Sequence, residues 1–221
     1  MKGWLRLFHF RTITSLGNMT SDGTYKFTWN AADGLVQVNL ASDDSLVANY
    51  KYDSSGRRVY ENVNGQETYF TYEGKSNRVL AEIDSAGTLK KYYTWGPEVQ
   101  LLSFTVDGTT YYTVSNGHGD IIQLTDENGD AVASYTYDAW GNILSETGSA
   151  ASLNPYRYAG YRYDESTGVY YLNARYYNPS LGKFLSSDAV FSNNLYVYCY
   201  NNPLTYVDPI GHTGVALNTP T

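Results

Sequence analysis

From Ser21 onward, the chain alternates polar residues with aromatic and β-branched residues in short runs. Alternation with a period of two predicts half-buried β-strands. The runs are punctuated by Asp-x-x-Gly and x-Asn-Gly, which predict hairpin turns, because Asp accepts hydrogen bonds from the backbone two residues on and Gly adopts a positive φ. No stretch of a dozen residues has apolar positions at helical spacing. The segments with the alternating pattern are 24–38, 49–72, 79–95, 104–114, 121–146 and 161–177.

The turn glycines recur regularly along the chain. Gly34 and Gly56 are 22 residues apart, and Gly87, Gly108 and Gly129 follow one another at intervals of 21. A period of about 20 residues corresponds to one two-stranded unit per repeat, and such units stack because none of them folds alone. The sequence therefore predicts an all-β fold, a spiralling antiparallel sheet of hairpins.

A short motif, Y-x-Y-D-x-x-G, marks several of these units. It occurs at 50–56 and 135–141, and with one extra residue at 161–168. The two tyrosines of each motif lie on one face of a strand, so rings of adjacent repeats can stack. The chain has 24 tyrosines. Because tyrosine packs a ring while its hydroxyl stays hydrogen-bonded, this content favours a sheet with semi-polar faces over an apolar sandwich core.

Charge and cysteine content exclude several classes of function. The net charge of −7 has no basic block, which argues against nucleic-acid binding as the main role. Cys199 is the only cysteine, so a disulfide framework is excluded; its neighbours predict a strand in which it is a small buried residue. No apolar run approaches a membrane span, and Arg6, His9 and Arg11 interrupt any signal-peptide core.

Three further features have a structural and a functional interpretation. His118 could be a metal ligand, but we favour a structural turn histidine. Residues 126–130 (DENGD) resemble part of a calcium loop, but without the flanking helices we expect a hairpin turn. Trp29, Trp95 and Trp140 could form a carbohydrate platform, but packing between strands is the better interpretation. No cofactor or metal is predicted.

Two longer motifs identify a family. Residues 163–188 read YDESTGVYYLNARYYNPSLGKFLSSD, and residues 194–211 read NLYVYCYNNPLTYVDPIG. With the YD repeats before them, they resemble the Rhs/YD-repeat proteins, and this block closely resembles the Rhs repeat-associated core domain. The resemblance covers about residues 18–212. It divides the chain into a non-repeat segment (1–17) of uncertain origin, YD repeats (18–154), the core domain (155–212) and a residual tail without a toxin domain (213–221).

The resemblance implies a shell. Proteins of this family build a hollow cocoon from a spiralling sheet, and the core domain curls inward to plug one end. Tyr and Thr on both faces suit a wall that is wetted on both sides. The expected partners, the rest of the shell and a C-terminal toxin cargo, both lie outside this chain. By the same resemblance the full-length protein is secreted or held at the cell surface.

The family also implies self-cleavage after Asp-Pro-x-Gly-x. The residues that match its machinery are Arg175, Asp188 and Asp208. Two carboxylates held close together do not both ionise cheaply, so one could activate water while the other protonates the departing group. Arg175 could hold a carboxylate or the carbonyl.

The cut would follow His212, which the turn formed by Pro209 and Gly211 would present. The sequence departs from the family here, because His212 stands where Leu is usual and Ala189 where Pro is usual.

Three functions therefore remain open from sequence alone. The first is a shell plug that is at most a single-turnover aspartyl self-protease. The second is a non-catalytic structural or adhesive module that binds a cell-surface glycan or protein. The third is a truncated remnant of a longer gene.

Overall fold

A computed structural model describes residues 12–97, 100–189 and 194–217. Its main element is a 12-stranded sheet in which every strand pairs antiparallel with the next along the chain. The strands are β1 (Tyr25–Trp29), β2 (Leu35–Leu40), β3 (Leu46–Tyr52), β4 (Arg58–Val63), β5 (Gln66–Tyr72), β6 (Val79–Ile83), β7 (Leu89–Trp95), β8 (Leu101–Val106), β9 (Thr109–Ser115), β10 (Ile121–Thr125), β11 (Ala131–Tyr137) and β12 (Ile143–Thr147).

The remaining elements belong to the C-terminal part of the chain. A four-stranded sheet contains β13 (Arg162–Asp164), β14 (Val169–Tyr171), β15 (Tyr176–Asn178) and β16 (Lys183–Phe184), and a hairpin pairs β17 (Tyr206–Val207) with β18 (Val215–Ala216). Three short 3-10 helices are η1 (Ala151–Leu153), η2 (Tyr158–Gly160) and η3 (Cys199–Asn201). Within the described residues, no helix is long and apolar enough to cross a membrane.

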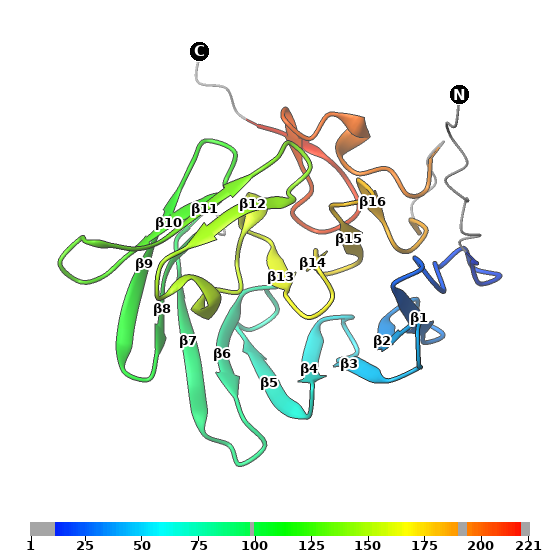
Figure 1. Ribbon diagram of the computed structural model, residues 1–221, viewed down its shortest axis with the longest axis horizontal. Coiled ribbons are helices and arrows are strands. Elements are labelled where there is room, and N and C mark those ends of the chain that lie inside the picture. Colours follow the sequence, from blue (N-terminus) through cyan, green and yellow to red (C-terminus); the bar gives the residue numbers. More distant parts are fainter. Residues whose placement is uncertain (1–11, 98–99, 190–193, 218–221) are drawn as a thin grey trace, which may run out of the picture.

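The large sheet curls around this C-terminal part, which we call the core block (residues 155–217). Figure 1 shows β1–β12 forming an arc with β13 and β14 in its hollow. The expectation of a wall wetted on both sides is therefore wrong for this segment, because the core block covers the concave face. Residues just before the repeats also contact the block, since Tyr196 Oη donates to Gly17 O at 2.7 Å.

Six turns of the sheet share one geometry. In each, the Oδ1 atom of the first residue accepts backbone N–H bonds from the second and fourth residues after it, at 2.8–3.0 Å. This confirms the predicted role of Asp as turn opener, and it makes residues 126–130 a hairpin turn between β10 and β11. The opening residues are Asn30, Asp53, Asp84, Asn116, Asp126 and Asp138.

Aromatic residues at strand ends form a second set of hydrogen bonds that stabilise the hairpins. The last residue of β3, β5, β7 and β11 donates a side-chain hydrogen bond to the carbonyl of the first residue of the preceding strand, at 2.6–2.8 Å. These donors are Tyr52, Tyr72, Trp95 and Tyr137. Trp29 similarly donates to Met19 O. The tryptophans are half-buried, so packing, and not an exposed platform, is the correct interpretation of them.

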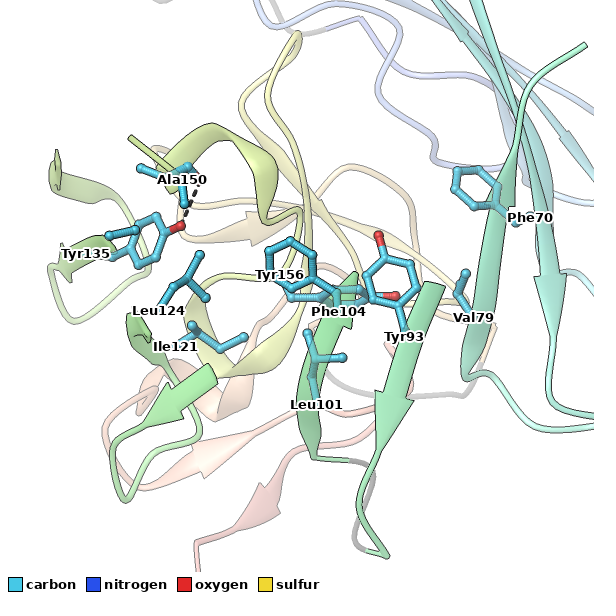
Figure 2. Packing of buried hydrophobic residues seen from close by; sticks show 12 residues of the cluster. Phe70, Val79, Tyr93, Leu101, Phe104, Ile121, Leu124, Tyr135, Ala150 and Tyr156 are labelled. Atoms are coloured by element: carbon cyan, nitrogen blue, oxygen red, sulfur yellow. Dashed lines mark hydrogen bonds between the residues drawn. The ribbon is translucent and has the colours of Figure 1, made fainter. Parts of the chain in front are cut away.

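The core lies between the concave face and the core block. Figure 2 shows one cluster, in which Tyr156 packs edge-on against Tyr93, with ring centroids 5.4 Å apart. A second cluster joins the first strands to the block, where Tyr50 and Tyr176 rings lie 5.7 Å apart. The tyrosine pair of a YD motif therefore does share one face, but the ring partner of Tyr50 comes from the core block.

Cys199 corrects one local prediction. It is buried, as expected, but it begins η3 and is not in a strand. Residues 199, 200 and 201 have φ of 46°, 54° and 59°. Three successive residues in this left-handed region are incompatible with an extended strand, and alternation of residue types gives no warning of it.

Candidate functional site

Asp208 forms the centre of a tight turn after β17. Its side chain is almost fully buried, and Oδ1 accepts backbone N–H bonds from Gly211, His212 and Thr213 at 2.9, 3.0 and 3.1 Å. Gly211 has a φ of 83°, and a Cβ there would lie 2.6 Å from Leu172 O. Only glycine fits such a position, so the Asp-Pro-x-Gly sequence fixes the backbone on both sides of residue 212.

Arg175 joins the two candidate carboxylates. It precedes β15 and is buried, with its guanidinium 3.6 Å from the centroid of the Phe184 ring. Its Nη2 atom lies 2.9 Å from Asp188 Oδ2 and 3.8 Å from Asp208 Oδ2. A single guanidinium nitrogen therefore holds both carboxylates in one cluster.

The other donors of Arg175 bind backbone carbonyls. Nε donates to Gly211 O, and Nη1 donates to Leu195 O at 3.0 Å. Burial lowers the pKa of Arg175, and the charges of Asp188 and Asp208 offset this only in part. Arginine stays protonated in proteins, so a poorly solvated cation binds the carbonyl of Gly211, one residue before the His212–Thr213 peptide bond. Negative charge that develops near it would be stabilised.

His212 completes the cluster. Its Nδ1 atom lies 2.9 Å from Asp188 Oδ1, so Asp188 is bound through one oxygen to an imidazole and through the other to a guanidinium. The Asp188 side chain is 7% exposed, whereas that of His212 is 32% exposed. The imidazole is therefore the part of the cluster that water reaches most easily.

A cavity of about 890 Å³ opens beside this cluster. Arg175 and His212 line one side, and the turns 30–34 and 53–57 of the large sheet line the other. A cavity of this size holds many water molecules, so hydrolytic water has a route to the site.

The structure brings together the residues that the sequence singled out for self-cleavage. Arg175, Asp188 and Asp208 form one cluster, and the turn containing Pro209 and Gly211 places residue 212 beside it. Sequence reasoning missed two contacts. The Asp188–His212 bond has no local signal, and Tyr161 Oη, which accepts the Asp208 N–H at 2.6 Å, lies within a motif interpreted only as a repeat.

A second histidine–aspartate pair lies elsewhere, in the turn after β9. His118 Nδ1 is 2.7 Å from Asp120 Oδ1, and Nε2 is 2.8 Å from Pro203 O. Burial works to lower the pKa of His118, but the hydrogen bond and charge of Asp120 and the carbonyl of Pro203 outweigh it, so the pKa is raised. His118 thus joins the sheet to the core block and is a structural histidine, as predicted.

A curled sheet of YD-motif hairpins around a C-terminal block defines a YD-repeat shell protein. The chain belongs to the teneurin YD-shell family, whose model matches residues 12–206. The predicted resemblance to YD-repeat proteins and the predicted spiralling all-β sheet are both confirmed.

Curated relatives come from bacteria and an insect. The chain is 47% identical over 204 residues to the tRNA nuclease WapA of Bacillus subtilis (strain 168), a match that covers 89% of this chain and 9% of that protein. It is 30% identical over 194 residues to salivary gland surface protein 1 of Aedes aegypti, covering 80% of this chain and 6% of that one. The chain thus spans less than a tenth of the length of these relatives.

Solved structures of toxin complexes share the fold. The crystal structure of TcdB2-TccC3-Cdc42 matches with a TM-score of 0.74 at 23% identity, covering 88% of this chain and 10% of that chain. The Photorhabdus luminescens Tc holotoxin pore matches with a TM-score of 0.73 at 22% identity, covering 92% and 11%. At this identity the match establishes the fold alone.

Proposed function

We propose that this chain is the C-terminal end of a secreted YD-repeat shell that encloses a toxin cargo and releases it by hydrolysing the His212–Thr213 bond. The cargo and the rest of the shell would lie outside the 221 residues. The relation to a tRNA nuclease and to toxin complexes supports a toxin-associated role.

One observation carries the cleavage proposal. Asp208 Oδ1 lies 3.1 Å from the backbone nitrogen of Thr213, the atom that would leave, while Asp208 Oδ2 lies near the guanidinium that also binds Asp188. A general acid must be within hydrogen-bond reach of the atom that it protonates, and this geometry meets that requirement. Arg175 would stabilise the negative charge that develops on the carbonyl oxygen.

The reaction follows from these positions. Water adds through its oxygen to the carbonyl carbon of His212. One of its protons passes to a base in the group formed by Asp188 and the residues bound to it. The C–N bond then breaks, and Asp208 in its acid form gives a proton to the nitrogen of Thr213. The products are a carboxylate on His212 and an amino group on Thr213. The bond that is cut belongs to the same chain as the residues that cut it, so each chain would react once.

Mass spectrometry of the whole chain tests this proposal. The wild type should lose the peptide 213–221 over time, and Asp208→Asn should stay intact, because an amide keeps the hydrogen bonds of the turn but cannot donate the proton. Asp126→Asn is the matched control, since Asp126 also opens a turn through Oδ1 but lies in the β10–β11 hairpin. A wild-type chain that stays intact, or an Asp208→Asn chain that is cut at the wild-type rate, would contradict the proposal.

A non-catalytic surface module is the second candidate, and the similarity to salivary gland surface protein 1 favours it. It predicts an intact wild-type chain that binds immobilised glycans or a cell-surface protein. Clean self-cleavage together with silence on a glycan array would exclude it.

A further inference from the structure

His212 is placed to do more than mark the cleavage position. Its Nδ1 atom binds Asp188 Oδ1 at 2.9 Å, and Asp188 Oδ2 is bound by Arg175 at 2.9 Å. Both oxygens of this carboxylate are therefore engaged by nitrogen donors. Because both oxygens already have nitrogen partners, neither is well placed to take a proton from water.

Asp208 is no better placed to take a proton from water. Its Oδ1 atom already accepts three backbone N–H groups, and the side chain is almost fully buried. The proposed reaction also assigns it the opposite task, proton donation to Thr213. Among the groups of this cluster, the imidazole of His212 is the one that combines exposure to the cavity with a second ring nitrogen that can act as a base.

The Asp188 bond favours the required tautomer. A carboxylate accepts from Nδ1–H, which leaves the lone pair on Nε2, and the same carboxylate stabilises the imidazolium that forms when Nε2 takes a proton. The imidazole belongs to the same residue as the carbonyl of the bond to be cut. Asp188, which binds this imidazole, lies 24 positions away in the sequence.

We infer that His212 is the general base of the cleavage reaction and that Asp188 is its positioning residue; this inference rests on the proposed function. Nε2 takes a proton from a water molecule in the cavity, and the water oxygen bonds to the carbonyl carbon of His212. The C–N bond breaks as Asp208 gives its proton to Thr213, and the imidazolium returns its proton to solvent. His212 would therefore supply both the carbonyl that is attacked and the base that activates the attacking water.

The inference predicts a particular pH profile. Cleavage should be slower in acid than at alkaline pH, because only the neutral imidazole accepts a proton. The charged groups of the core block in this cluster are Arg175, Asp188 and Asp208, and those that line the cavity from the large sheet are Asp33, Lys51, Asp53 and Arg57.

Three substitutions of His212 test whether it acts as a base or only orients other groups. His212→Ala should cleave about 100-fold more slowly or worse, and added imidazole should restore part of the rate through the open cavity. His212→Leu should be equally slow and lose the rise with pH. His212→Asn can still donate to Asp188 but cannot act as a base, so it should also be slow. A wild-type rate in His212→Asn would overturn the inference.

A measurement without cleavage gives an independent test. In Asp208→Asn, which should stay intact, nitrogen-15 chemical shifts of neutral His212 should show the proton on Nδ1; a proton on Nε2 would overturn the inference. If the wild type cleaves and all three His212 variants match its rate and pH profile, the inference fails while the proposed function stands. If the wild type does not cleave, both fail.

Discussion

Arg58 and Arg175 are two of the buried arginines that lie between two carboxylates, but they differ in what they bind. Arg58 contacts both oxygens of Asp164, at 2.5 and 2.9 Å, and also Glu61 at 3.3 Å. Arg175 gives one nitrogen to Asp188 and Asp208 together and binds backbone carbonyls with the rest. The first is an ion pair between sheet and core block in which Nε of Arg58 has no hydrogen-bond partner. The second also binds the carbonyl of Gly211, one residue before the proposed cleavage position.

The effect on each guanidinium follows from this difference. Burial would lower the pKa of Arg58, but Asp164 and its other anionic neighbours outweigh burial and the pKa is raised. At Arg175 burial prevails, and the pKa is lowered. The two histidine–aspartate pairs repeat the contrast, since both nitrogens of His118 are bound whereas His212 faces a cavity. The same residue types thus serve folding in one place and, in our proposal, chemistry in the other.

The largest expected effect is a loss of cleavage when the Arg175 cluster is changed, which a change in the Arg58 cluster should not cause. Asp188→Asn should slow cleavage by about 100- to 10,000-fold, because an amide cannot stabilise the imidazolium or orient it as a carboxylate does. Its free energy of unfolding should change less than that of Asp164→Asn, since Arg175 keeps its carbonyl partners. The measurement is a cleavage time course by intact mass at equal protein concentration. A cleavage rate within twofold of the wild type would break the comparison.

Asp164→Asn should have the opposite profile. It leaves Arg58 buried without its main partner, which costs about 3–5 kcal/mol of unfolding free energy in urea titrations. The folded fraction should cleave at the wild-type rate. Asp53→Asn is the control, because the Asp53–Arg57 pair is partly exposed and its loss should cost less than about 1 kcal/mol. Equal losses for the two variants would contradict the structural role of the Arg58 cluster.

The His118 pair should show its role in the pH dependence of stability. Because folding raises the pKa of His118, its contribution is fully present below the ordinary value of 6.5 and is lost as pH rises through the raised value. At pH 6, His118→Asn should cost about 1.5–3 kcal/mol, the range for hydrogen bonds to charged groups. The cost should shrink at pH 9, and urea titrations at both values measure it. A cost that does not depend on pH would mean that the charged form contributes nothing.

The smallest expected effect concerns the sheet itself. Tyr137→Phe removes only the hydrogen bond to Ile121 O and should cost about 0.5–1.5 kcal/mol, with cleavage unchanged. Tyr112→Phe is the matched control, because Tyr112 lies on β9 and is about half-exposed. Differential scanning calorimetry of both variants suffices, and equal melting temperatures would show that the strand-end bond is dispensable.

The repeats could be predicted from sequence because their determinants are local. The turn at Asp126 depends only on residues within four positions, so the sequence DENGD is enough to predict its geometry. The cluster of Arg175, Asp188 and Asp208 could be predicted only through the family motif. The spiralling sheet could be predicted as well, but the contacts that hold it around the core block could not. They include pairs such as Arg58–Asp164, two residues that are 106 positions apart and that each look in the sequence like ordinary surface residues.

Hydrolysis of the wild-type chain in oxygen-18 water tests the central claim most directly. The account predicts a fragment that ends at His212 and carries one oxygen-18 atom in its new carboxylate, together with unlabelled peptide 213–221. Asp208→Asn should give neither product. A wild-type chain that stays intact, or a fragment ending at His212 without the label, would contradict cleavage by water at this site.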